Sequence, residues 1–203
     1  MIITTLVHLC FWCAMAMVFL KLFVPKSSKW LWVLAGAFLV SIVGDWFLRG
    51  PTSDSEFILG IAGYFFAHIG FLAYGWKFIT GPRKFSWLVA AVVFTPFLIF
   101  YFVSLWPSPP FQNNIFLAAA ALVYLLISCL TLTVSIDIKS GRQPSWSWFY
   151  AIGVACLAAS DTLIALNAFL GQWHLNQFIL PLFYTSYVFI AVSVVIQHLT
   201  EQK

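Results

Sequence analysis

Seven long apolar stretches, separated by short polar or turn-forming breaks, dominate this chain. Their approximate limits are 4–24, 30–48, 57–79, 85–106, 114–136, 146–169 and 176–198. Each is close to the roughly 20 residues that an α-helix needs to cross about 30 Å of hydrocarbon. Because the breaks are short, successive helices must run antiparallel. The pattern therefore predicts an all-α fold, a polytopic bundle of seven transmembrane helices that forms one integral membrane domain over residues 1–203.

Composition argues against a water-soluble fold. Of the 203 residues, 63% are apolar and 8% are charged, whereas soluble domains carry about 25% charged residues. A transmembrane barrel would instead show alternating segments of about ten residues. The net charge of +4 fits the usual excess of Lys and Arg in membrane loops. We therefore expect membrane lipid around the protein and no nucleic-acid partner.

The basic residues indicate how the bundle is oriented. With the amino terminus outside, nine of the ten Lys and Arg residues fall on the cytoplasmic side and only Arg49 falls on the other. This asymmetry is the positive-inside tendency, and a miscount of one span would scramble it. We expect the amino terminus outside, the carboxyl terminus in the cytoplasm and, from the short loops without a targeting extension, a bacterial cytoplasmic membrane.

Two aspartates lie inside the predicted spans. Asp45 follows Gly44, Asp161 follows Ser160, and each is fifteen residues beyond the tryptophan that opens its span. At 1.5 Å per residue, both lie about 22 Å above the inner ends of their helices. Placing a carboxylate at membrane depth costs about 2.5–3.5 kcal/mol on insertion scales. Two of them at matching depth indicate an active site or an ion path.

Three further polar side chains reach the same level. Tyr64 and Tyr184 each lie about eight residues into an inward-running span, and His68 is one turn deeper than Tyr64 on the same helix face. Simpler roles remain open for each group. Asp45 is four residues from Arg49, an allowed helix pair, the histidine could bond a carbonyl across helices, and the tyrosines could be packing residues. The residues alone predict an intramembrane polar site and leave a hydrolase and a proton-coupled carrier open.

The sequence shows no metal or cofactor motif. Cys10 and Cys13 share one helix face, but no second Cys or His pair accompanies them, so they read as buried apolar residues. We expect neither a metal nor a cofactor.

Three ordered groups of residues resemble the motifs of a known family. They are Ser41-Ile-Val-Gly-Asp45-x-x-Leu48, Gly63-x-x-x-Ala67-His68, and Gly153 followed by Ser160-Asp161 and Ala165-Leu-Asn167-x-Phe169. Together they are similar to the motifs of the YhhN family, across spans two to seven. Its characterised members are lysoplasmalogenases, integral membrane hydrolases. The resemblance implies a lysophospholipid substrate, a 1-alkenyl glycerophosphoethanolamine or glycerophosphocholine, that is cleaved to a fatty aldehyde and a glycerophospho-base.

This chemistry suits two carboxyl groups. A vinyl ether hydrolyses by protonation of its β-carbon, and water then captures the oxocarbenium ion. One neutral carboxylic acid must donate the proton, and one carboxylate must stabilise the cation and deprotonate water. The hypothesis is that Asp45 and Asp161 form this pair, with the acid and the base unassigned. His68, Tyr64, Tyr184, Ser160 and Asn167 would orient the substrate or water.

Other functions remain open from the sequence. A proton-coupled transporter of lipids or small molecules would also keep intramembrane aspartates, although it would usually show repeated halves, which this chain does not. A structural or regulatory bundle would tolerate neutral residues at both positions. A hydrolase of ester-bonded lysophospholipids is disfavoured by the lack of a Gly-x-Ser-x-Gly motif.

Overall fold

The predicted helix bundle is confirmed. The computed structural model describes residues 2–24, 28–48, 53–79, 86–140 and 145–201, and none of these residues lies in a β-strand. The elements are α1 (Ile2–Phe23), α2 (Trp30–Leu48), α3 (Asp54–Trp76), α4 (Trp87–Phe100), the π-helix η1 (Tyr101–Leu105), α5 (Pro109–Asn113), α6 (Ile115–Ser140), α7 (Trp146–Leu170), the 3₁₀-helix η2 (Trp173–Leu175) and α8 (Asn176–Glu201). In the described part, six helices are long and apolar enough to cross a membrane, and α1 adds a shorter apolar stretch, Leu9–Phe23.

With α4 and η1 taken together, the elements match the predicted spans to within four residues: α6 and α8 end later than predicted, at Ser140 and Glu201, and α3 is shifted toward the amino terminus. This helix begins three residues before the predicted span, at Asp54. Ser53 explains the earlier start, because its side-chain oxygen accepts a hydrogen bond from the Glu56 backbone N–H at 3.3 Å. Such a cap satisfies one of the free N–H groups at a helix start, and the acidic residues of the first turn favour the positive end of the helix dipole.

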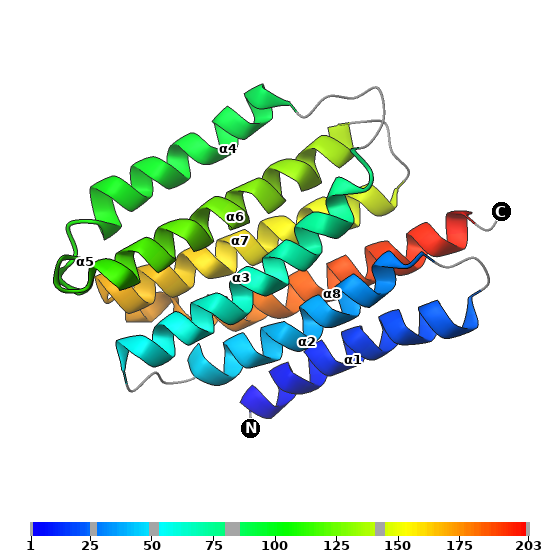
Figure 1. The fold of residues 1–203 in the computed structure, drawn as a ribbon, viewed down its shortest axis with the longest axis horizontal. Coiled ribbons are helices and arrows are strands. Elements are labelled where there is room, and N and C mark those ends of the chain that lie inside the picture. Colours follow the sequence, from blue (N-terminus) through cyan, green and yellow to red (C-terminus); the bar gives the residue numbers. More distant parts are fainter. Residues whose placement is uncertain (1, 25–27, 49–52, 80–85, 141–144, 202–203) are drawn as a thin grey trace.

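The long helices run side by side along one axis, and the two chain ends lie at opposite ends of the bundle (Figure 1). This is the arrangement that an odd number of crossings requires. The most extensive contacts join α7 to α8 and α2 to α3. Helix α4 stands at the edge and packs mainly on α6 (Figure 1). Which end faces the cytoplasm stays a prediction.

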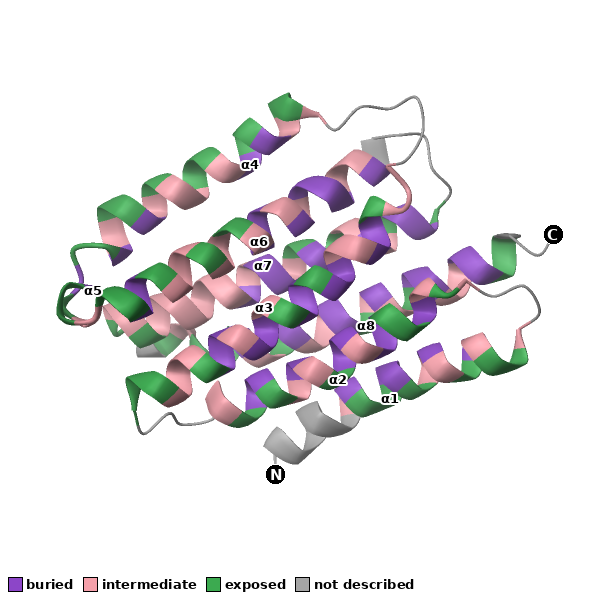
Figure 2. Ribbon diagram, viewed as in Figure 1, coloured by how far each residue is buried: buried purple, intermediate pink, exposed green. Residues whose placement is uncertain are grey.

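Polarity is distributed as expected for a protein in lipid. Large apolar side chains such as Trp12, Trp87 and Phe116 are exposed around the bundle, while Ser41 and His68 are buried within it (Figure 2). In water such a surface would be a large exposed apolar patch, and in a bilayer it faces hydrocarbon. The chain is therefore an integral membrane protein.

Glycines let α2 and α3 approach closely. A Cβ atom added to Gly63 would lie 2.6 Å from the backbone nitrogen of Gly44, and one added to Gly60 would lie 2.5 Å from a side-chain carbon of Leu48. Small residues allow such contacts between helices in lipid. The contact places Asp45, next to Gly44, against Tyr64, next to Gly63.

A π-helix interrupts the regular geometry after α4. Pro96 lies inside α4, and the turn that follows it, Tyr101–Leu105, is a π-helix. Wide turns of this kind are rare and often occur at functional sites. Tyr101 is buried and its hydroxyl donates to the Ala118 carbonyl at 2.7 Å. The π-helix is thereby tied to α6.

Candidate active site

Asp45 is buried between three helices. Its side chain is on α2, it is 6% exposed, and one carboxylate oxygen accepts a hydrogen bond from the Tyr64 hydroxyl of α3. The Cys10 thiol of α1 donates to the other oxygen at 3.9 Å. Phe183 meets the Tyr64 ring edge to face at 5.6 Å. Gly44 and Phe183 thus fix the phenol beside the carboxylate, since a Cβ on Gly44 would lie 2.9 Å from the ring.

Asp161 pairs with His68. The Asp161 carboxyl of α7 lies 3.2 Å from Nε2 of His68 on α3, with side-chain exposures of 9% and 1%. The other ring nitrogen, Nδ1, lies 3.4 Å from the Thr131 hydroxyl of α6. That hydroxyl donates its own hydrogen to the Ile127 carbonyl at 2.8 Å. Three helices therefore meet at one imidazole ring.

These hydrogen bonds limit where protons can be. Because Thr131 donates to a carbonyl, its oxygen acts as the acceptor and Nδ1 of His68 carries a hydrogen. A neutral ring then presents a lone pair at Nε2, which matches a protonated Asp161. A doubly protonated ring matches an ionised Asp161 equally well. In both arrangements one hydrogen lies between Nε2 of His68 and the Asp161 carboxyl.

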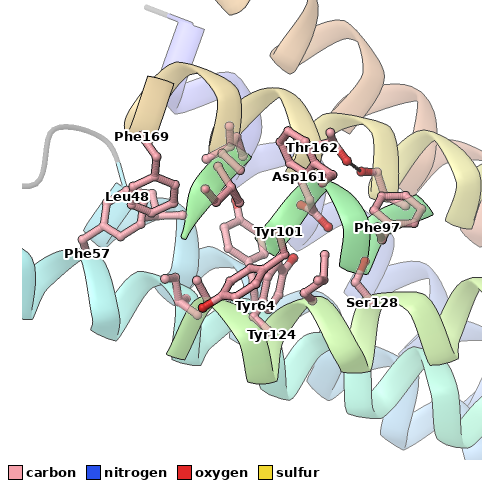
Figure 3. Close-up of a pocket in the computed structure, with 18 residues that line it drawn as sticks. Leu48, Phe57, Tyr64, Phe97, Tyr101, Tyr124, Ser128, Asp161, Thr162 and Phe169 are labelled. Carbon is pink, nitrogen blue, oxygen red and sulfur yellow. Dashed lines mark hydrogen bonds between the residues drawn. The ribbon is translucent and has the colours of Figure 1, made fainter. Parts of the chain in front are cut away.

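A pocket opens directly in front of Asp161. The space between its lining residues amounts to about 720 Å³, which includes room open to the surroundings. Asp161, Tyr64 and Tyr124 lie in its middle (Figure 3). The remaining lining residues are mostly apolar and come from α2, α3, α4, η1, α6 and α7.

The two aspartates differ in their access to this pocket. Asp161 and Tyr64 both line it. Asp45 is not among the lining residues, and its carboxylate accepts the hydrogen bond from the Tyr64 hydroxyl. Four of the five groups predicted to share one layer thus form two hydrogen-bonded pairs, Asp45 with Tyr64 and Asp161 with His68. One member of each pair, Tyr64 and Asp161, lines the same pocket.

The other predicted site residues lie away from the pocket lining. Ser160 donates to the Ile179 carbonyl at 3.0 Å and ties α7 to α8. Tyr184 is half-buried against the core of the bundle. The buried Oδ1 atom of Asn167 has no hydrogen-bond partner in the described part of the chain. Their roles in orienting substrate or water stay predictions, and Arg49, the proposed partner of Asp45, lies outside the described residues.

Sequence reasoning missed the contribution of α6. Tyr124 and Ser128 line the pocket, and Thr131 bonds His68. The three residues are spaced by four and three positions, so they share one helix face. A polar stripe of this spacing in an apolar span was the signal that could have identified them.

The described residues offer no site for a metal ion. No group of three or more His, Cys, Asp or Glu side chains among them is arranged to hold one. The four cysteines are free thiols. The ionisable groups described at the site include two carboxyl groups, an imidazole and phenols.

Comparison with known proteins places this arrangement in a family. The model of the YhhN family matches residues 3–194. The chain belongs to the YhhN family. Two similar relatives, each named lysoplasmalogenase, come from Mycobacterium bovis and Mycobacterium tuberculosis, and each is 27% identical over 153 residues.

The match to these relatives is partial. It includes 72% of this YhhN chain and 52% of each relative, so the chain spans about half the length of the curated relatives it matches. No solved structure matches this YhhN protein significantly.

Proposed function

We propose that this protein is a lysoplasmalogenase-like ether hydrolase that cleaves the vinyl ether of a single-chain phospholipid. One observation carries the proposal: a carboxyl group that is hydrogen-bonded to an imidazole lines a mostly apolar pocket inside a membrane protein. Membership of the YhhN family and the names of the mycobacterial relatives support the same chemistry.

The pocket suits a lipid with one hydrocarbon chain. Leu48, Phe57 and Phe169 lie at one end, toward the end of the bundle where α2 finishes, and Phe97 and Ser128 lie at the other (Figure 3). A lipid keeps its head group at the membrane surface. Its vinyl ether, near the glycerol, then lies beside Asp161 while the chain follows the apolar wall.

Asp161 is proposed as the general acid. Its proton passes to the β-carbon of the vinyl ether, and the bond electrons of the alkene form the new C–H bond. The adjacent carbon and the ether oxygen then share the positive charge of an oxocarbenium ion. The ionised Asp161 remains beside this cation and stabilises it, and His68 holds the carboxyl in place. General acid catalysis of this kind contributes typically 10²–10⁴-fold.

Asp45 is proposed as the base, acting through Tyr64. The Tyr64 hydroxyl donates to Asp45, so its oxygen can accept a hydrogen from water in the pocket. As water adds to the cation, its proton passes to Tyr64 and the phenol proton passes to Asp45. The hemiacetal that forms then breaks its bond to the glycerol oxygen. That oxygen takes back the proton from Asp45 through Tyr64, and the hemiacetal hydroxyl gives its proton to Asp161, which restores both carboxyl groups. The products are a fatty aldehyde and a glycerophospho-base.

The proposal is tested with purified protein in detergent and a lysoplasmalogen. We expect aldehyde release without any ion gradient, which a gradient-coupled transporter would not give. Asp161→Asn is expected to lower the rate by 10²-fold or more, and Asp45→Asn to lower it as well. Asp54→Asn is the matched control, because Asp54 is exposed at the start of α3, where it accepts a hydrogen bond from Asn114.

Two results would contradict the proposal. Wild-type protein that binds the lipid but releases no aldehyde would contradict the proposed vinyl ether hydrolysis. Full turnover by a folded Asp161→Asn variant would remove Asp161 from the chemistry.

A further inference from the structure

Tyr124 carries a buried hydroxyl that no group in the described part of the chain satisfies. The hydroxyl oxygen is inaccessible to solvent and has no hydrogen-bond partner there, although the residue lines the pocket. Buried tyrosine hydroxyls usually find a partner. A phenol left without one inside a pocket indicates where a ligand supplies it.

The position of this hydroxyl is well defined. The Tyr124 ring meets the His68 ring edge to face, with centroids 5.3 Å apart and planes at 80°. Its hydroxyl lies near enough to the Asp161 carboxyl to interact with it and to approach it as a hydrogen-bond donor, although the geometry falls short of a full hydrogen bond. Tyr124, Tyr64 and Asp161 all line the middle of the pocket, so the Tyr124 phenol lies near the reacting carboxyl (Figure 3).

The chemistry of the substrate limits what can bind there. The ether oxygen gives its lone pair to the double bond and becomes positively charged during the reaction, so a hydrogen bond to it would oppose the proposed step. The alkenyl chain has no polar atom. The nearest good partner is the free hydroxyl on the central glycerol carbon, which is both a donor and an acceptor.

We propose that the Tyr124 hydroxyl binds this free hydroxyl of the glycerol and thereby selects single-chain lipids over their two-chain counterparts. The inference rests on the proposed function. In a two-chain lipid the hydroxyl of the central glycerol carbon is esterified. It can then no longer donate a hydrogen bond to Tyr124, and a bulky acyl group occupies its place. Sites built around a substrate hydroxyl reject analogues that lack it, because their own polar group is then left unpaired.

The test combines one substitution with one change in the substrate. Rates are measured as kcat/KM for wild type and Tyr124→Phe, with a 1-alkenyl lysophospholipid and with its 2-deoxy analogue, which lacks the hydroxyl. We expect each single change to lower kcat/KM roughly 10- to 100-fold. With both changes together, the rate should fall no further than with one.

Tyr101→Phe is the matched control. Tyr101 lines the same pocket, but its hydroxyl already donates to the Ala118 carbonyl. The Tyr101→Phe variant should therefore keep the wild-type ratio of kcat/KM between the two lipids. Thermal unfolding of both variants in detergent verifies that they are folded.

Independent losses would overturn the inference. If the losses of kcat/KM from the substitution and from the 2-deoxy lipid multiply, Tyr124 acts on water or on Asp161 and not on the glycerol hydroxyl. Binding of an uncleavable 1-alkyl lysophospholipid and its 2-deoxy analogue separates this failure from a failure of the proposed function. Wild type should bind the 1-alkyl lysophospholipid more tightly than its 2-deoxy analogue, and Tyr124→Phe should bind both equally. Equal binding of the two lipids by wild type would overturn the inference, whether or not any lipid is cleaved.

Discussion

At the residue scale, the two aspartates have different surroundings and different tasks. Asp161 faces the pocket and shares a proton with His68, whereas Asp45 reaches the pocket only through Tyr64. The proposed hydrolysis needs one group that donates a proton and another that removes one. The two environments provide this division of labour, because one carboxyl is paired with a base and the other accepts from a phenol and a thiol.

Thr131 is predicted to be a positioning residue for this chemistry. Replacing Thr131 by Val keeps the shape but removes the oxygen that accepts from His68. The ring can then turn away from Asp161, and one hydrogen bond of this kind corresponds to about a tenfold loss. We expect kcat to fall about tenfold with KM unchanged, and Thr131→Ser to restore it. Equal kcat values for the Val and Ser variants would show that the hydroxyl is not needed.

The sequence predicted the residues of the site better than their orientations. Matching depth along the helices follows from counting residues, so Asp45, Tyr64, His68 and Asp161 could be assigned to one layer. The direction in which each side chain points depends on how each helix is rotated by its neighbours. That rotation depends on packing between distant segments, and Tyr124 was missed for the same reason.

At the element scale, the contact between α2 and α3 holds the site together. It brings Asp45 against Tyr64, and it depends on glycines at the contact, where a Cβ atom would meet the facing helix. The limits of the helices were also predictable, because apolar runs and turn-forming breaks set them. The π-helix after α4 was not, since it reflects how the end of that helix packs on α6.

Gly63→Ala is predicted to destabilise the protein. The added Cβ would meet the backbone of α2 at 2.6 Å, and overpacking of this kind costs typically 1–3 kcal/mol. Gly36→Ala is the control, because a Cβ there has no neighbour within 4 Å. Thermal unfolding in detergent should show a lower midpoint for Gly63→Ala and an unchanged or higher one for Gly36→Ala. Equal midpoints would mean that the contact is looser than described.

At the scale of the whole molecule, lipid is the solvent that explains the fold. Many large apolar side chains are exposed on the outside of the bundle, and polar ones such as Ser41, Asp45 and His68 are buried within it. Composition alone predicted this, because a chain with 8% charged residues cannot cover itself with polar groups. The bundle contains a mostly apolar pocket that is partly open to its surroundings.

The orientation of the bundle gives a separate prediction. Alkaline phosphatase, which is active only outside the cytoplasm, can be fused after each long helix in turn. We expect activity for fusions after α2, α4 and α7 and none after α1, α3, α6 and α8, because the basic residues stay inside. The reverse pattern would place Asp45 and Asp161 nearer the cytoplasmic surface.

The account rests most on protonation of the vinyl ether carbon by a carboxyl group of the protein. It is tested most directly by turnover in D₂O, with the aldehyde trapped as an oxime while it forms. The proposed mechanism predicts one deuterium on the carbon next to the aldehyde carbon, and loss of this product in Asp161→Asn. Aldehyde without deuterium at that carbon, or deuterated aldehyde formed at the full rate by Asp161→Asn, would contradict it.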